Sequence, residues 1–169
     1  MQSSEAQLQF LSAMRNAKFG LFRIQTGLTE IRKMLGSYAQ NLEIEAGEII
    51  ASLDGVIFYF SDEDKTVLEI VKIPHQVEPK VQWFRQVNLG WFGWASLQSL
   101  KDISELLAQS EIEHKLAIYT DGSQAIIRAK GSSTIKMVYG QGGELVEVTN
   151  GFYWMESIDQ IRELRTIDV

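Results

Sequence analysis

The sequence contains no cysteine, and this absence removes several kinds of chemistry from consideration. Disulfide bonds, thiolate nucleophiles and cysteine-based zinc sites are excluded, and a chain without cysteine suits a reducing compartment. Only two prolines occur and no segment is of low complexity, so a long interdomain linker is not expected. The 169 residues suffice for one domain with a sizeable core, or for two small fused units.

Long apolar runs are missing as well. No segment approaches the roughly 18 consecutive apolar residues that a membrane-spanning helix requires. The N-terminal stretch, residues 1–18, lacks the basic start and apolar centre of a signal peptide. We therefore expect a cytoplasmic protein that makes no contact with a membrane.

Positive charge is scarce. The net charge of −6 disfavours a general nucleic-acid-binding protein, which must meet phosphates with Lys and Arg. No basic residue occurs between Lys33 and Lys65, and a candidate acidic patch lies there, formed by Glu43, Glu45, Glu48, Asp62, Glu63 and Asp64. Such a patch can steer a basic partner toward the protein. A solvated face plus a charged turn is the simpler interpretation.

The usual catalytic and metal-binding motifs do not occur. His75 and His114 stand alone, outside any metal-ligand spacing, and Asp62-Glu63-Asp64 lacks the EF-hand pattern. The glycine-rich stretch 140–143 has no following P-loop Lys. We therefore predict no catalytic residue, no metal ligand and no cofactor.

The chain instead carries an internal repetition. Residues 90–103 read GWFGWASLQSLKDI, and residues 151–164 read GFYWMESIDQIREL; they align without a gap. Both have a Gly, two aromatic residues, a Ser six positions after the Gly, and then an amphipathic helical pattern. A duplicated unit would place Gly90 and Gly151 at equivalent bends. Two similar strand-to-helix junctions of independent origin are the alternative.

Periodicity predicts the remaining elements. Helical spacing indicates one helix from Ser4 to Lys18 and a second from Thr29 to Leu42. Asp54-Gly55 and Asp121-Gly122, each between apolar runs, predict tight β-hairpins. The predicted strands are 49–50, 56–60, 66–73, 81–89, 116–119, 125–129, 134–139 and 145–149. A helix over 96–109, capped by Ser96, and a closing helix over 157–165 complete the prediction.

These elements define an α+β fold. We predict a mainly antiparallel sheet built from two similar strand-rich units, each ending in a helix, with one or two amphipathic helices in front. The segments are 1–45, which is helical, 46–110, which is the first unit, and 111–169, which is the second; residues 46–169 would form one compact pseudo-symmetric domain. The two strand sets would meet about an approximate two-fold axis. This order of elements is similar to that of small secretion-chaperone-like proteins, which implies an adaptor or chaperone role and assigns no residue.

Aromatic residues concentrate in the repeated motif and just before it. Candidate partner-binding residues are Trp83, Phe84, Trp91, Phe92, Trp94, Tyr153 and Trp154. Tryptophan dominates interface hot spots when it is partly exposed, whereas the same rings could instead fill the core. In an extended segment Trp91 and Phe92 would point to opposite sides, so at least one ring is expected at the surface.

The favoured function is therefore a non-enzymatic, protein-binding accessory: a chaperone-like adaptor, an inhibitor or an assembly subunit. The expected partner is another protein with a basic surface, and self-association into a homo-oligomer is left open; no nucleic acid and no membrane are expected. A small-ligand-binding domain with an aromatic-lined pocket is the alternative. An enzyme using carboxylates and a metal is less favoured.

Overall fold

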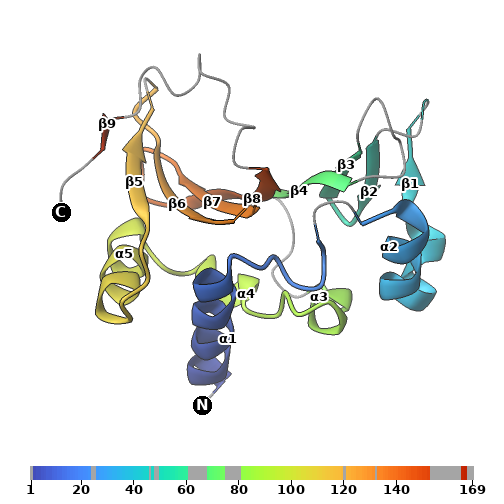
Figure 1. The fold of residues 1–169 in the computed structure, drawn as a ribbon, viewed down its shortest axis with the longest axis horizontal. Helices are drawn as coiled ribbons and strands as arrows, with labels where there is room; N and C mark the ends of the chain where they lie inside the picture. The colour runs from blue at the N-terminus through green and yellow to red at the C-terminus, as the bar shows by residue number, and fades with distance from the viewer. Residues whose placement is uncertain are drawn as a thin grey trace.

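The computed structural model describes residues 2–23, 26–45, 47, 50–60, 68–74, 81–119, 121–131, 133–152 and 165–166. Among the described residues, α1, α2 and a 3₁₀ helix precede the sheet, and α3, α4 and α5 follow its first half (Figure 1). The helical elements are α1 (Gln2–Asn16), α2 (Leu28–Leu35), the 3₁₀ helix η1 (Gly36–Asn41), α3 (Trp83–Gln86), α4 (Phe92–Ala95) and α5 (Leu100–Gln109). The helix predicted from Thr29 thus tightens into a 3₁₀ segment at Gly36, where φ is +57°.

Nine strands form one antiparallel sheet in the order β1-β2-β3-β4-β8-β7-β6-β5-β9. The strands are β1 (Glu43–Ile44), β2 (Ile50–Leu53), β3 (Val56–Phe60), β4 (Leu68–Pro74), β5 (Lys115–Ile118), β6 (Gln124–Lys130), β7 (Ser133–Tyr139), β8 (Leu145–Phe152) and β9 (Arg165–Thr166). The chain therefore has the predicted α+β fold with a mainly antiparallel sheet and N-terminal helices.

The sheet contains two sequence-consecutive sets of strands that meet at a central seam. Strands β4 and β8 pair antiparallel there, with Ile73 opposite Val148 and Val71 opposite Asn150. Counting outward from the seam, β4 to β1 on one side correspond to β8 to β5 on the other. A two-fold axis through the seam would place β4 and β8 side by side and antiparallel, which is the pairing observed.

The finer equivalences predicted from the repeated motif are wrong. Gly90 lies in a turn between α3 and α4, whereas Gly151 lies within β8 opposite Thr134. The two Asp-Gly turns also differ in place: Asp54-Gly55 joins β2 to β3, whereas Asp121-Gly122 joins β5 to β6, one strand farther from the seam. The closing helix predicted over 157–165 lies outside the described residues, apart from Arg165, which belongs to β9.

The Asp54-Gly55 hairpin shows why this dipeptide is a strong signal. Both residues have positive φ, +50° at Asp54 and +87° at Gly55, which matches the backbone twist of a two-residue hairpin. Gly accepts this conformation without strain, and Asp tolerates it better than most residues. The turn sets the register of β2 and β3, in which Leu53 lies opposite Val56.

The helices lie on one side of the sheet (Figure 1), and the core fills the space between the two layers. Residues at alternate positions of the strands face this layer, as the buried Val56, Phe58 and Phe60 of β3 show. A single buried cluster contains residues from each of the three sequence segments 1–45, 46–110 and 111–169. The helix layer and the two halves of the sheet therefore share one hydrophobic core.

Helix α1 lies beneath the middle of the sheet rather than at an end or an edge (Figure 1). Arg128 of β6 donates from Nε to the carbonyl of Met14, at 2.9 Å, and from Nη2 to that of Arg15, at 3.1 Å. Ser133 of β7 donates to the carbonyl of Ala17, at 2.8 Å. A cation at a helix C-terminus satisfies free carbonyls and interacts favourably with the helix dipole, so these contacts fix α1 on the sheet.

The segment 81–89 is helical where an extended strand was predicted. Trp83, Phe84 and Val87 are buried, and their spacing of one and four residues is helical. Asn88, with φ of +60°, ends the turn of α3. The strand prediction for 81–89 is therefore wrong, because Trp83, Phe84 and Val87 are buried together on one side of a helical turn.

Candidate functional site

Most of the predicted partner-binding aromatic residues lie in the core. Trp83, Phe84 and Trp91 are each 1% exposed, and Phe92 is 3% exposed. All four belong to the hydrophobic core, where their ring contacts form two groups. The rings of the first group are Trp91, Phe10 and Phe19, and those of the second are Trp83, Phe84, Phe92, Phe22 and Phe58. A partner cannot reach these rings in this conformation. Tyr153 and Trp154 lie outside the described residues.

The helical backbone of α4 explains why Trp91 and Phe92 are both buried. An extended segment would direct consecutive side chains to opposite sides, whereas a helix separates them by only about 100°. Trp91, Phe92 and Ala95 therefore share the buried face, and Trp94 lies at its border, half-buried. The expectation that one of these rings approaches the surface is met by Trp94, not by Trp91 or Phe92.

The three tryptophans of this segment have three different environments. The Trp83 indole donates from Nε1 to Oδ2 of Asp54, at 2.8 Å, which ties α3 to the β2–β3 turn. The Trp91 Nε1 is buried and has no hydrogen-bond partner among the described residues. The Trp94 ring packs on Phe10 of α1, with ring centroids 5.4 Å apart and a 49° interplanar angle.

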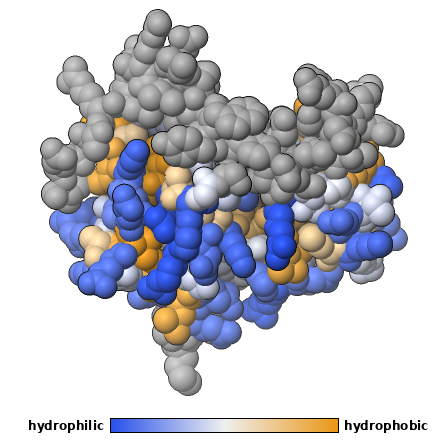
Figure 2. Space-filling model, viewed as in Figure 1, coloured by the Kyte–Doolittle hydropathy of each residue, from blue (hydrophilic) through white to orange (hydrophobic). Residues whose placement is uncertain are grey.

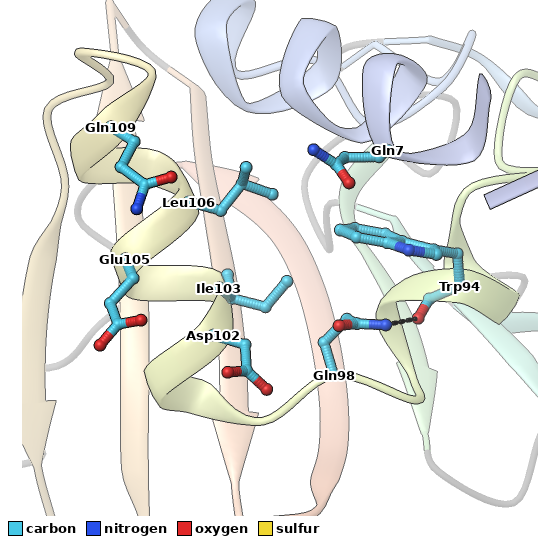
Figure 3. Close-up of a pocket in the computed structure, with 8 residues that line it drawn as sticks. All are labelled: Gln7, Trp94, Gln98, Asp102, Ile103, Glu105, Leu106 and Gln109. Atoms are coloured by element: carbon cyan, nitrogen blue, oxygen red, sulfur yellow. Dashed lines mark hydrogen bonds between the residues drawn. The ribbon is translucent and has the colours of Figure 1, made fainter. Parts of the chain in front are cut away.

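Trp94 lines an open groove of about 320 Å³ between α1 and α5. We call this surface the Trp94 groove. Its lining residues are Gln7, Trp94, Gln98, Asp102, Ile103, Glu105, Leu106 and Gln109. Figure 3 shows the side chains of Ile103 and Leu106 projecting from α5 toward the Trp94 indole, with Gln7 of α1 above the ring in this view. The amide of Gln98 donates to the Trp94 carbonyl, at 3.3 Å.

Helix α5 supplies the acidic wall of the groove. Ser99 caps the helix: its Oγ accepts from the Asp102 backbone N–H, at 3.1 Å, and donates to Asp102 Oδ2, at 2.8 Å. Ser99, rather than the predicted Ser96, is therefore the cap. Glu105 forms a 3.9 Å ion pair with Lys101 whose side chains are 53% and 81% exposed, so solvent weakens it strongly. No lining residue is basic, so the groove has a negative character.

Among the described residues, three large apolar side chains are exposed: Leu8, at 67%, Leu21, at 40%, and Leu97, at 82%. In the chain, Leu8 directly follows the groove residue Gln7, and Leu97 directly precedes the groove residue Gln98. Figure 2 shows apolar atoms exposed on the part of the surface over α1. Leu97 was predicted as an apolar position of the helix over 96–109, but it precedes the helix.

The candidate acidic patch is only partly within the described residues. Glu43 and Glu45 are exposed at β1, at the end of the sheet opposite β5 and α5 (Figure 1). Glu48, Asp62, Glu63 and Asp64 lie outside the described residues. The acids that line the groove, Asp102 and Glu105, are a separate set that the sequence reasoning did not single out. The sequence feature that could have identified these acids is helical spacing. Positions 102, 105, 106 and 109 lie on one face of α5, beside the buried stripe that contains Ile103 and Leu107.

The structure gives His114 a partner that the sequence did not indicate. Its Nε2 lies 3.1 Å from Ser104 Oγ, and its Nδ1 lies 2.9 Å from the carbonyl of Ile112. A neutral ring that donates from Nδ1 and accepts from the Ser104 hydroxyl satisfies both contacts. Ser104 is 6% exposed and faces the sheet, so the pair ties α5 to the start of β5. His75 lies outside the described residues.

Neither a metal centre nor a membrane helix emerges from the part of the chain that the structure describes. No group of three or more His, Asp or Glu side chains there has the arrangement to hold a metal ion. None of the described helices has both the length and the apolar character needed to cross a membrane.

Comparison with known proteins assigns no family. No family model matches the chain, and no curated protein sequence matches it. Among solved structures, the chain is similar to a DUF4309 family protein (YjgB) from Bacillus subtilis subsp. subtilis str. 168. The sequences are 12% identical, the TM-score is 0.46, and the likeness covers 90% of this chain and 99% of the other. At this level of similarity we transfer no function.

Proposed function

We propose that this protein is a non-enzymatic binding module, an accessory or adaptor that receives a segment of a partner protein in the Trp94 groove. The observation that carries the proposal is the partly buried Trp94 indole, which faces the partly exposed Leu106 across an open groove (Figure 3). Partly exposed tryptophans in a concave setting are frequent anchors of protein interfaces.

The rigidity of the groove supports this role. One wall is α1, which Arg128 and Ser133 hold on the sheet, and the other is α5, which has a full N-terminal cap. The floor ring is supported from below by the buried Phe10. A surface that is already ordered loses little conformational entropy on binding, which favours affinity.

A small-ligand site is a second candidate, and it is favoured by the size and polarity of the same groove. Its volume of about 320 Å³ is at the small end of ligand pockets. The amides of Gln7, Gln98 and Gln109 offer donors and acceptors beside an aromatic ring. A metabolite screen followed by tryptophan fluorescence tests this candidate: a saturable change that Trp94→Phe removes would favour the small ligand.

The main proposal is tested by site-specific photo-cross-linking in the cells that make the protein. A photoreactive phenylalanine analogue replaces Gln109, an exposed lining residue, and a matched analogue replaces Glu30, an exposed residue of α2 far from the groove (Figure 1). We expect one protein to be captured from position 109 and not from position 30. That protein, once identified and purified, should bind the wild-type chain.

Dependence on the groove decides the outcome. Leu106→Glu should weaken binding of the purified partner by at least about tenfold, because it places a charge in the apolar wall. Circular dichroism and thermal unfolding check that the variant is folded. Equal binding by wild type and Leu106→Glu, or the same captured proteins from both positions, would contradict the proposal. A cross-link between two copies of this chain would replace the adaptor role with self-association.

A further inference from the structure

We infer that the anchor of the partner segment is an arginine side chain, whose guanidinium group stacks on Trp94 and pairs with the Asp102 carboxylate of α5. This inference rests on the proposed function and specifies the chemistry of the partner. Three properties of the Trp94 groove lead to it: its charge, its aromatic floor and its apolar wall.

The charge of the groove selects a cation. Asp102 and Glu105 line it and no lining residue is basic. Asp102 uses Oδ2 for the Ser99 hydroxyl, while its Oδ1 accepts no hydrogen bond among the described residues. Figure 3 shows the Glu105 carboxylate on the side of α5 away from Trp94, where its ion-pair partner among the described residues is Lys101, at 3.9 Å. Asp102 therefore supplies the carboxylate that a positively charged side chain in the groove can reach.

The aromatic floor also favours a cation. Tryptophan is the side chain with the strongest attraction for a cation placed over its ring face. Trp94 is half-buried. It lines the groove between α1 and α5, and these helices shield part of the ring from solvent (Figure 3). The same ring lies within the groove that Asp102 lines, so one cationic group can address both.

The apolar wall and the amides distinguish arginine from lysine. Leu106 projects toward Trp94 and is partly exposed, so it offers a surface for the methylene stem of a long side chain, whereas Ile103 beside it is fully buried (Figure 3). The guanidinium group is planar, stacks on aromatic faces and carries five donors, whereas the ammonium of lysine is a compact, strongly hydrated charge. The carbonyl oxygens of Gln7 and Gln98 add neutral acceptors for those donors.

Three matched peptides test the inference. Each is capped at both ends and has the sequence Gly-Leu-X-Leu-Gly, where X is arginine, lysine or citrulline, the neutral isostere of arginine. Binding is followed by the NMR signal of the Trp94 indole N–H, assigned by its loss in Trp94→Phe. We expect a saturable shift with the arginine peptide. The lysine peptide should bind several-fold more weakly than the arginine peptide, and the citrulline peptide at least about tenfold more weakly.

Variants of the protein locate the electrostatic contribution. Asp102→Asn removes the charge while leaving an oxygen that can accept from Ser99. It should weaken the arginine peptide by about three- to tenfold. The matched control Glu30→Gln removes the same charge from α2 and should leave binding unchanged. Raising the salt concentration should weaken arginine binding and leave any citrulline binding unaffected.

The possible results separate this inference from the proposed function. Equal binding of the arginine and citrulline peptides at Trp94 overturns the arginine anchor and leaves the groove as a protein-binding site. No shift of the Trp94 signal at millimolar arginine peptide overturns it as well. An equal loss of affinity in Glu30→Gln and Asp102→Asn overturns the local pairing in favour of net charge. Failure of the proposed function itself would instead appear as partner binding that is insensitive to Leu106→Glu.

Discussion

Trp91 and Trp94 are three residues apart, yet one belongs to the hydrophobic core and the other to the Trp94 groove. Trp91 is 1% exposed and touches Phe10 and Phe19 edge-on. Trp94 touches the same Phe10 and is only half-buried. Phe10 of α1 therefore separates a core environment from a surface environment. The difference shows that position relative to α1, and not residue type, decides which tryptophan is available to a partner.

The difference also concerns polar atoms. In the core, the Trp91 Nε1 and the Tyr139 hydroxyl are buried without hydrogen-bond partners among the described residues. In the groove, the polar atoms face solvent and lose little by lacking a protein partner. A ligand can thus gain hydrogen bonds in the groove without any rearrangement of the core.

Truncating each tryptophan should give the largest contrast. Trp91→Ala removes a fully buried ring and should lower the free energy of unfolding by about 3–5 kcal/mol. Trp94→Ala should lower it by less, about 1–2 kcal/mol, because part of the Trp94 surface is already hydrated and one ring contact, with Phe10, is lost. Denaturant unfolding measures both. Comparable losses for the two variants would show that Trp94 is a core residue and would remove the basis of the groove.

Breaking the tie between Trp83 and Asp54 should have the next largest effect. Asp54→Ala leaves the buried indole N–H without its 2.8 Å acceptor and places alanine at a φ of +50°. We expect a loss of about 2–3 kcal/mol in unfolding free energy. Asp54→Asn keeps an acceptor and tolerates this backbone, so it should cost less than about 1 kcal/mol. A large loss in the asparagine variant would show that the charge, and not the turn and acceptor, is responsible.

On the groove side, Ser99→Ala should destabilise α5 moderately. The variant removes the oxygen that caps the Asp102 N–H, and the expected loss is about 1 kcal/mol. Ser96→Ala is the matched control, since the Ser96 hydroxyl only donates to the Gly93 carbonyl. Thermal unfolding compares the two. A greater loss in Ser96→Ala would return the cap to the position that the sequence suggested.

The smallest expected effect concerns the buried Tyr139 and has the opposite sign. Tyr139→Phe removes a hydroxyl without a partner among the described residues and should raise the unfolding free energy by about 0.5–1 kcal/mol at neutral pH. Tyr38→Phe, at a half-exposed residue whose hydroxyl donates to Gln82, is the control and should give no gain.

The same pair of variants gives a pH dependence. Burial raises the pKa of Tyr139 well above its ordinary value of 10.0, so the folded state binds this proton more tightly than the unfolded state does. The resulting stability is fully present below pH 10.0 and decreases as the pH rises above it. We expect the wild type to lose more stability above this pH than Tyr139→Phe. Parallel decreases in both proteins would contradict the assignment.

Much of the strand pattern could be predicted because it depends on local chemistry. The Asp54-Gly55 turn and the strands on both sides of it follow from backbone preferences and alternation, and β6 to β8 follow likewise. The strand predicted over 81–89 is wrong. The helical conformation of these residues depends on burying Trp83 and Phe84 together against the sheet, a long-range effect.

The candidate site was less predictable than the fold. The sequence indicated that the stretch from Trp83 to Trp94 had more aromatic residues than a core requires, and one of them, Trp94, does reach the surface. It gave no means to choose Trp94 over Trp91. It also could not place Gln7 beside α5, because this contact depends on α1 crossing beneath the sheet.

By itself the sequence determined the α+β class, the antiparallel hairpins, the N-terminal helices and the absence of cysteine chemistry. These properties depend on residue type and on spacings within a few positions. Only the tertiary structure decided the pairing of β4 with β8, the burial of Trp83 and Trp91, and the groove around Trp94. Each of these depends on which distant segment occupies a given face: β8 beside β4, and Phe10 of α1 between two tryptophans. Local preferences carry no information about such neighbours, because many arrangements of the same elements satisfy them equally well.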